Sequence, residues 1–147
     1  AHTASHQGAL VAEIIAGHDK LVFEPNAIPN VVYTDPEIAW CGLTEEEAKK
    51  EGPAVKVARF PWAASARPTP QDTNDGVTKL LIDPATDRIL GVGITGSGAG
   101  ELIAEGVLGL EYGASSEDIA RTCHAHPTLS EAFKEAAMDV YDKPIHF

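Results

Sequence analysis

The sequence predicts an α+β domain in which an antiparallel β-sheet is flanked by helices. The predicted strands cluster in the middle of the chain and most of the predicted helices follow them, an order that favours α+β over a doubly wound α/β fold. The strands expected at 77–82 and 89–95 are joined by a turn too short for a parallel crossover, so they form an antiparallel hairpin. A length of 147 residues fits one domain.

The first half of the chain is expected to alternate helix and strand. Helical spacing of apolar residues predicts the first helix, and β-branched or alternating patterns predict the strands. The second helix has the clearest signal, because Thr44 and Glu47 form a capping box and Gly52 is a natural stop. In chain order, the predicted elements are a helix over 5–17, a strand over 31–34, a helix over 44–52 and a strand over 54–62.

After a polar loop predicted over 63–76, the second half holds the hairpin and then three helices. These helices are expected over 101–110, 115–122 and 128–140. Thr128 is predicted to cap the last helix, which has the cleanest apolar stripe of the chain. The stripe consists of Leu129, Ala132, Phe133, Ala136, Ala137 and Val140.

Composition excludes several classes of function. The chain has 22 acidic residues against 11 Lys and Arg, a net charge of −11, which disfavours nucleic acid and anionic membranes as partners. No run approaches the roughly 18 apolar residues that span a bilayer, and no secretion signal is present at the start. We expect a soluble, intracellular domain. Because the chain begins with Ala and a helix, we also expect it to be a piece of a larger protein.

Two features that suggest chemistry have simpler interpretations. Cys41 and Cys123 lie 82 positions apart without C-x-x-C partners, so both are predicted to be buried free thiols. Residues 91–96 fit the letters of G-x-G-x-x-G, but they lie inside a predicted strand, whereas a dinucleotide fingerprint needs a strand, a turn and then a helix. We interpret these glycines as sites of close backbone contact within a strand.

His126 with Glu131 is the stronger catalytic candidate. Imidazole exchanges protons near neutral pH, and a carboxylate that fixes its tautomer makes it a better base. Two alternatives stay open. Thr128-x-x-Glu131 is also a capping box, and His124-x-His126 with Glu131 or Asp118 is a weak metal-binding pattern.

Four segments together resemble the dihydrolipoamide dehydrogenases, which are flavin disulfide reductases. They are AHTASHQG (1–8), YTDPEIAWCGLTE (33–45), FPWAASAR (60–67) and HAHPTLSE (124–131). The resemblance is collinear over the whole chain and implies that residues 1–147 are the family's C-terminal dimerisation domain. It implies that the FAD domain, the NAD domain and the C-x-x-x-x-C redox pair lie outside this chain, which alone should be inactive. Another flavin disulfide reductase, of the mercuric or glutathione reductase kind, and an inactive self-association module are the alternatives.

The resemblance also implies site residues and partners. His126 would take a proton from a dihydrolipoamide thiol, Glu131 would orient it, and both would reach across a homodimer to the redox disulfide in the partner's FAD domain. Ala1 and His2 would contact FAD, NAD would be the second cofactor of the parent, and no metal is implied. Lipoyl domains of 2-oxo acid dehydrogenase complexes would be partners, in the bacterial cytosol or the mitochondrial matrix.

Three positions depart from the family pattern, and one further histidine is expected to have no direct part in proton transfer. Thr3 stands where the family usually has a basic residue, and Pro68 and Pro70 replace an Ala-rich stretch. His124 is expected to be structural or to support the site rather than to exchange protons itself.

Overall fold

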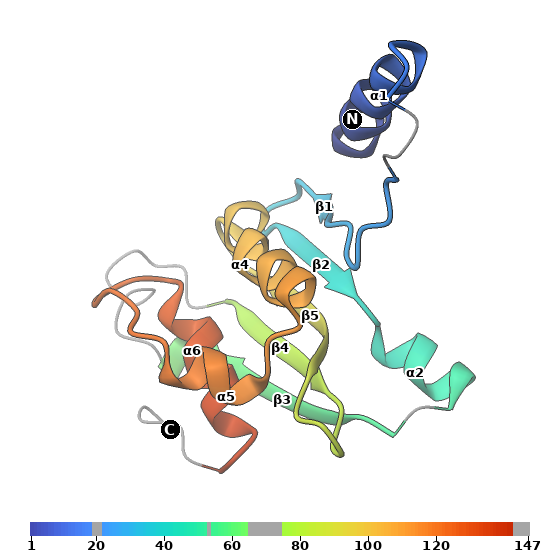
Figure 1. Ribbon diagram of the computed structural model, residues 1–147. Helices are drawn as coiled ribbons and strands as arrows, with labels where there is room; N and C mark the ends of the chain where they lie inside the picture. Colours follow the sequence, from blue (N-terminus) through green and yellow to red (C-terminus); the bar gives the residue numbers. More distant parts are fainter. Residues whose placement is uncertain (19–21, 53, 65–74, 143–147) are drawn as a thin grey trace.

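The computed structural model describes residues 1–18, 22–52, 54–64 and 75–142. Its strands form one antiparallel sheet in the order β1-β2-β5-β4-β3 (Figure 1). The strands are β1 (Asn30–Val32), β2 (Ile38–Gly42), β3 (Lys56–Pro61), β4 (Val77–Ile82) and β5 (Ile89–Thr95). The helices are α1 (His2–Ile15), α2 (Glu45–Glu51), the 3₁₀ turn η1 (Trp62–Ala64), α4 (Ala99–Tyr112), α5 (Ser116–Arg121) and α6 (Glu131–Asp139). The predicted α+β class is confirmed.

The core lies between the sheet and the later helices. Helix α4 packs on β2 and β5, α6 packs on β3 and β4, and α5 packs on α6 (Figure 1). Two rows of register partners cross the sheet on the face toward these helices, and all their members are buried. One row is Ala39, Ile94, Thr78 and Phe60, and the other is Cys41, Val92, Leu80 and Ala58. The indole N–H of Trp62 donates to Thr78 Oγ1 at 3.0 Å, which satisfies the one hydroxyl in these rows.

Strand β2 is absent from the prediction, which places no strand between 34 and 54. In the structure Ile38–Gly42 pairs with β1 on one side and β5 on the other. Its buried face consists of Ala39 and Cys41, and Ile38 is its only β-branched residue. Strand propensity largely reflects the fit of branched and aromatic side chains to a half-buried pleated surface, so a strand that buries small residues gives little signal.

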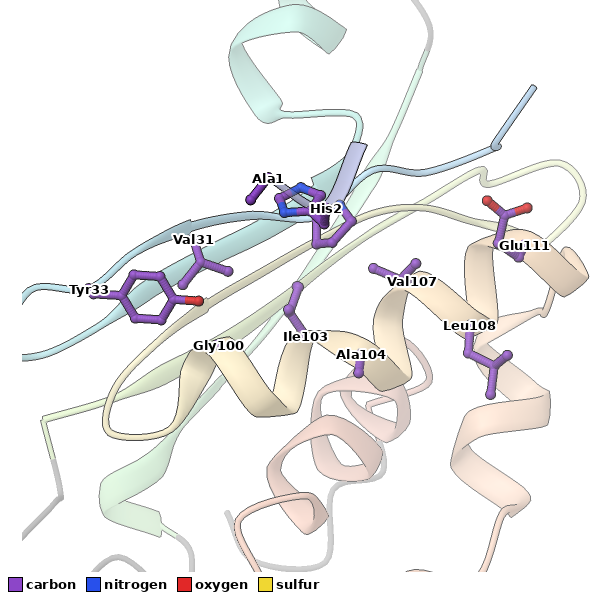
Figure 2. A pocket seen from close by; sticks show the side chains of 11 residues that line it. Ala1, His2, Val31, Tyr33, Gly100, Ile103, Ala104, Val107, Leu108 and Glu111 are labelled. Atoms are coloured by element: carbon purple, nitrogen blue, oxygen red, sulfur yellow. The ribbon is translucent and has the colours of Figure 1, made fainter. Parts of the chain in front are cut away.

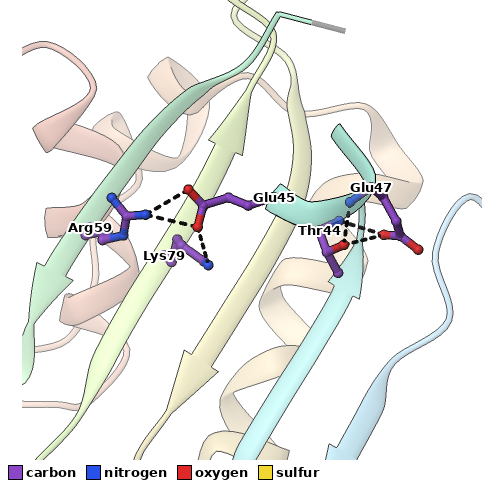
Figure 3. A network of polar contacts seen from close by, with 5 residues as sticks. All are labelled: Thr44, Glu45, Glu47, Arg59 and Lys79. Atoms are coloured by element: carbon purple, nitrogen blue, oxygen red, sulfur yellow. Dashed lines mark hydrogen bonds and ion pairs between the residues drawn. The ribbon is translucent and has the colours of Figure 1, made fainter. Parts of the chain in front are cut away.

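Helix α2 begins as predicted and is fixed to the sheet by ion pairs (Figure 3). Thr44 Oγ1 accepts the Glu47 N–H at 3.2 Å, and the Glu47 carboxylate accepts the Thr44 N–H at 2.9 Å, so the capping box is confirmed. Glu45 then reaches two neighbouring strands, with its carboxylate 2.8 Å from Arg59 Nη2 on β3 and 2.9 Å from Lys79 Nζ on β4.

Helix α1 is present as predicted but buries none of its residues. It stands apart from the sheet and its covering helices (Figure 1). Of its apolar side chains, Val11, Ile14 and Ile15 are 54%, 46% and 82% exposed. Its described link to the following segment is a stack of His6 on Phe23, with ring centroids 5.6 Å apart. None of the described helices is long and apolar enough to cross a membrane.

The interpretation of the glycine-rich segment is confirmed at Gly91, whereas Gly93 makes only ordinary contacts and Gly96 follows the strand. Gly91 lies in β5, where a Cβ would overlap the carbonyl oxygen of Leu43. Gly96 has φ +144° and lies against the Trp62 ring, where a Cβ would overlap the indole. Both glycines therefore allow close packing between the sheet and its neighbours.

The prediction for the cysteines is half right. Cys41 is buried, and burial raises the pKa of its thiol to about 12, so it is inert as a nucleophile. Cys123 is exposed, which corrects the expectation of a buried thiol. Most of the predicted loop over 63–76, with Pro68 and Pro70, lies outside the described residues.

Candidate active site

His126 and Glu131 meet at the start of α6, on the segment that joins α5 to α6. His126 Nδ1 lies 2.9 Å from Glu131 Oε1. The histidine side chain is 62% exposed, whereas the glutamate side chain is 16% exposed. The pair therefore combines a shielded carboxylate with an imidazole that is open to an incoming molecule.

Both carboxylate oxygens of Glu131 are held. Oε1 faces His126, and Oε2 accepts the Thr128 N–H at 2.8 Å. Glu131 is also the first residue of α6, where the helix dipole stabilises a negative charge. These contacts hold the carboxylate in one orientation.

The predicted cap of the last helix is wrong. Helix α6 begins at Glu131 with Ser130 as its N-cap, and no side chain caps it. The Thr128 hydroxyl instead donates to the Ala125 carbonyl at 2.6 Å. Only half of the expected capping box forms, namely the bond from the Thr128 N–H to Glu131. In a capping box the Glu131 carboxylate would only accept the Thr128 N–H, whereas here it also bonds His126.

The pair has the chemistry of an oriented base. An ionised carboxylate only accepts hydrogen bonds, so Nδ1 of His126 carries the proton. Nε2 then holds the lone pair, and no described residue bonds to it. An imidazole in this tautomer accepts a proton at Nε2, and the carboxylate stabilises the imidazolium that results.

His124 lies two residues away and faces inward. Its Nε2 is 2.6 Å from Glu105 Oε1 on α4, its Nδ1 is 3.0 Å from the Thr122 carbonyl oxygen, and its side chain is 6% exposed. His124 and His126 thus bond different carboxylates. Within the described residues no group of three His, Cys, Asp or Glu side chains is placed to hold a metal ion, so the structure does not support the metal-binding alternative.

Ala1 and His2 line a groove between the start of α1 and α4 (Figure 2). The other side chains that define it are mostly apolar, among them Val31, Tyr33, Ile103 and Val107. His126 and Glu131 do not line this groove, so the structure does not bring the two predicted sets of site residues into one cavity. A mostly apolar lining with a few polar groups is typical of sites that bind small molecules.

The fold matches part of the chain in two solved structures. It superimposes on LpdA from Mycobacterium tuberculosis with a TM-score of 0.83 at 23% identity, covering 91% of this chain and 29% of that one. It superimposes on the HOCl-induced flavoprotein disulfide reductase RclA from Escherichia coli, solved as a Cu(II) complex, with a TM-score of 0.80 at 25% identity, covering 88% of this chain and 30% of that one.

The sequence defines the family. Residues 28–137 match the model of the pyridine nucleotide-disulphide oxidoreductase dimerisation domain, and the chain belongs to this family. Curated relatives include the dihydrolipoyl dehydrogenase of Trypanosoma brucei brucei, 56% identical over all of this chain, and the mitochondrial enzyme of Dictyostelium discoideum, 54% identical over 99% of it. The chain spans 30% of the length of each of these relatives.

Proposed function

We propose that residues 1–147 are the C-terminal dimerisation domain of a dihydrolipoyl dehydrogenase. In the parent, this domain supplies an acid–base pair to an active site shared between two subunits. The observation that carries the proposal is the His126–Glu131 contact, at 2.9 Å, within a chain more than half identical to enzymes of that name. The reacting disulfide and most of the cofactor sites would belong to the rest of the parent.

His126 would act first on a thiol of dihydrolipoamide. Nε2 takes the thiol proton, because the thiolate is the attacking species in thiol–disulfide exchange. The thiolate attacks the redox disulfide of the partner subunit, so one S–S bond forms as the original one breaks and releases a thiolate. The second substrate thiol gives its proton to the released thiolate and attacks the first sulfur, which gives cyclic lipoamide and releases the other enzyme sulfur as a thiolate. The enzyme's pair is then reduced to one thiol and one thiolate, and the first proton stays on His126.

Glu131 would hold the base in its working state. Its carboxylate keeps the proton on Nδ1 before the transfer and pairs with the imidazolium afterwards. The low exposure of Glu131 strengthens this attraction, because water screens the pair on the histidine side only.

The cofactors of the parent would be FAD and NAD. Ala1 and His2 would contact FAD from the groove beside α4, and the mostly apolar lining of that groove supports this assignment. FAD, when bound, would carry two electrons from the reduced cysteine pair to NAD. The residues that hold NAD would lie outside residues 1–147.

The proposed partners follow from the family and from the proposed activity of the parent. A dimerisation domain pairs with a second copy of its chain, and the substrate would arrive on lipoyl domains of 2-oxo acid dehydrogenase complexes. The compartment would be the mitochondrial matrix or the bacterial cytosol, since several relatives are mitochondrial dihydrolipoyl dehydrogenases.

Replacing the base tests the proposal. In the full-length parent, His126→Gln removes the proton acceptor but keeps a polar side chain at an exposed position. We expect kcat/KM for dihydrolipoamide to fall by about 10²–10⁴-fold, the usual contribution of a general base, with FAD content unchanged. Turnover equal to that of the unmodified enzyme would overturn the assignment.

A further inference from the structure

His124 is the one inward-facing side chain in the segment that carries His126. Residues 122, 123 and 125–127 are all exposed. The His124 side chain is 6% exposed. A segment with so little buried surface has few contacts to hold its conformation, so its position depends strongly on this residue.

Glu105 ties His124 to a different part of the fold. It lies on α4, which packs on β2 and β5, and its Oε1 is 2.6 Å from His124 Nε2. Among the described residues, no other polar contact links residues 123–127 to an element other than α5 and α6. This contact therefore connects the exposed segment to the helix and sheet at the centre of the molecule.

The hydrogen bonds of His124 hold its ring in one orientation. The Thr122 carbonyl can only accept, so Nδ1 donates to it. Nε2 faces a carboxylate, and a hydrogen bond there requires one proton shared between the ring and Glu105. The ring is thereby fixed from both sides.

We infer that Glu105 and His124 position His126 for proton transfer. This inference rests on the proposed function and adds two positioning residues to it. A single residue, Ala125, separates His124 from His126, so a shift of His124 displaces the base. A displacement of about 1 Å at a reacting group can cost up to about 10²-fold in rate.

Two substitutions at Glu105 separate the hydrogen bond from the charge. Glu105→Ala removes the partner of His124 altogether. Glu105→Gln keeps a hydrogen bond, because the amide N–H can donate to Nε2 while Nδ1–H stays on the Thr122 carbonyl. Glu101→Gln is the matched control, since Glu101 is an exposed carboxylate one turn earlier on the same helix.

The measurements use the full-length FAD-loaded parent. We expect Glu105→Ala to lower kcat for dihydrolipoamide by about tenfold, and Glu105→Gln and Glu101→Gln to stay within about twofold of the unmodified enzyme. NADH-driven reduction of ferricyanide, which needs no proton from a dithiol, should be unchanged in all three. Hydrogen exchange of the peptide covering 122–130 should be faster in Glu105→Ala only.

Several results would overturn the inference. Unchanged dihydrolipoamide turnover in Glu105→Ala would do so, and so would equal losses of turnover in Glu105→Ala and Glu105→Gln. A loss of ferricyanide reduction that parallels the loss of turnover would also overturn it, because it would indicate a general structural defect. If Glu105→Ala retains no FAD, Glu105→Asp replaces it, since shortening the side chain also breaks the bond. Failure of the proposed function is distinct, because it would show as full activity in His126→Gln.

Discussion

At the scale of single residues, the proposed chemistry depends on which nitrogen of His126 carries the proton. Glu131 decides this, because its Oε1 accepts from Nδ1 and its Oε2 is committed to the Thr128 N–H. The carboxylate is shielded at 16% exposure, whereas the imidazole is 62% exposed. A fixed tautomer on an accessible ring is the arrangement that a base needs when its substrate arrives from another molecule.

Glu131→Gln tests this control of the tautomer in the parent. The Thr128 N–H would select the amide oxygen of the new side chain, which turns the amide N–H₂ toward Nδ1. Nδ1 would then accept and Nε2 would carry the proton, which is the wrong tautomer for a base. We expect kcat/KM for dihydrolipoamide to fall at least about tenfold with FAD retained.

The control for that substitution is Glu117→Gln, which removes an exposed carboxylate paired with Arg121 on α5. It should leave kcat/KM within about twofold of the unmodified enzyme. Equal kinetics in Glu131→Gln and Glu117→Gln would show that Glu131 has no influence on the base.

The sequence predicts the contact between His126 and Glu131 but not the contact between His124 and Glu105. His126 and Glu131 are five positions apart, so a turn before a helix is enough to bring them together. Glu105 and His124 are 19 positions apart and meet only after α4 has packed on the sheet and α5 on α6. No local pattern predicts such a contact. The exposure of Cys123 was missed for the same reason, since it depends on the path of the segment rather than on neighbouring residues.

At the scale of elements, Glu45 joins α2 to the sheet. The hydrogen bond from Lys79, with the added effect of Arg59, lowers the pKa of Glu45 below its ordinary value of 4.5. A carboxyl group whose folded-state pKa is depressed adds stability above its unfolded pKa. That stability is lost as the pH falls through the folded value.

Glu45→Gln should therefore destabilise the chain in a pH-dependent way. At pH 7 we expect the free energy of unfolding to fall by about 1 kcal/mol, the upper range for an accessible ion pair. The difference should shrink as the pH falls below 4.5, because the unmodified carboxyl group then becomes neutral as well. Urea unfolding of the 147-residue chain at pH 7 and in acid measures this.

Glu46→Gln is the matched control on the same first turn. Its carboxylate pairs with Lys50 on the helix surface, where both side chains are at least 70% exposed. Both substitutions remove one charge from the positive end of the helix dipole. They differ in the ion pair that is lost, which joins the sheet for Glu45 and stays within the exposed helix for Glu46. Equal destabilisation by the two variants would contradict the proposed role of Glu45 as a link to the sheet.

The predicted elements succeed where the signal is local. The capping box at Thr44 and the bounds of β4 and β5 match the structure, because caps, alternation and a short turn are read from adjacent residues. Strand β2 was missed because its burial pattern involves small side chains. The start of α6 was placed too early, because the Thr128 hydroxyl bonds a loop carbonyl in place of the helix.

At the scale of the whole molecule, the proposed function makes this chain one part of a larger active site. The described residues hold the His126–Glu131 pair, the His124–Glu105 pair and a mostly apolar groove. Helix α1, with its exposed apolar side chains, stands apart from the rest of the fold. The base and the groove share no lining residue, which is consistent with a site completed by a second subunit.

Mixed dimers of the full-length parent test most directly whether His126 serves the disulfide of the other subunit. One subunit carries His126→Gln and the other carries serine in place of the redox cysteines, and tags on the two chains allow the hybrid to be purified. If the base acts across the dimer, the hybrid holds one intact site and should show about half the unmodified dimer's dihydrolipoamide oxidation. No activity in the hybrid, with both chains folded and FAD-loaded, would contradict the shared site.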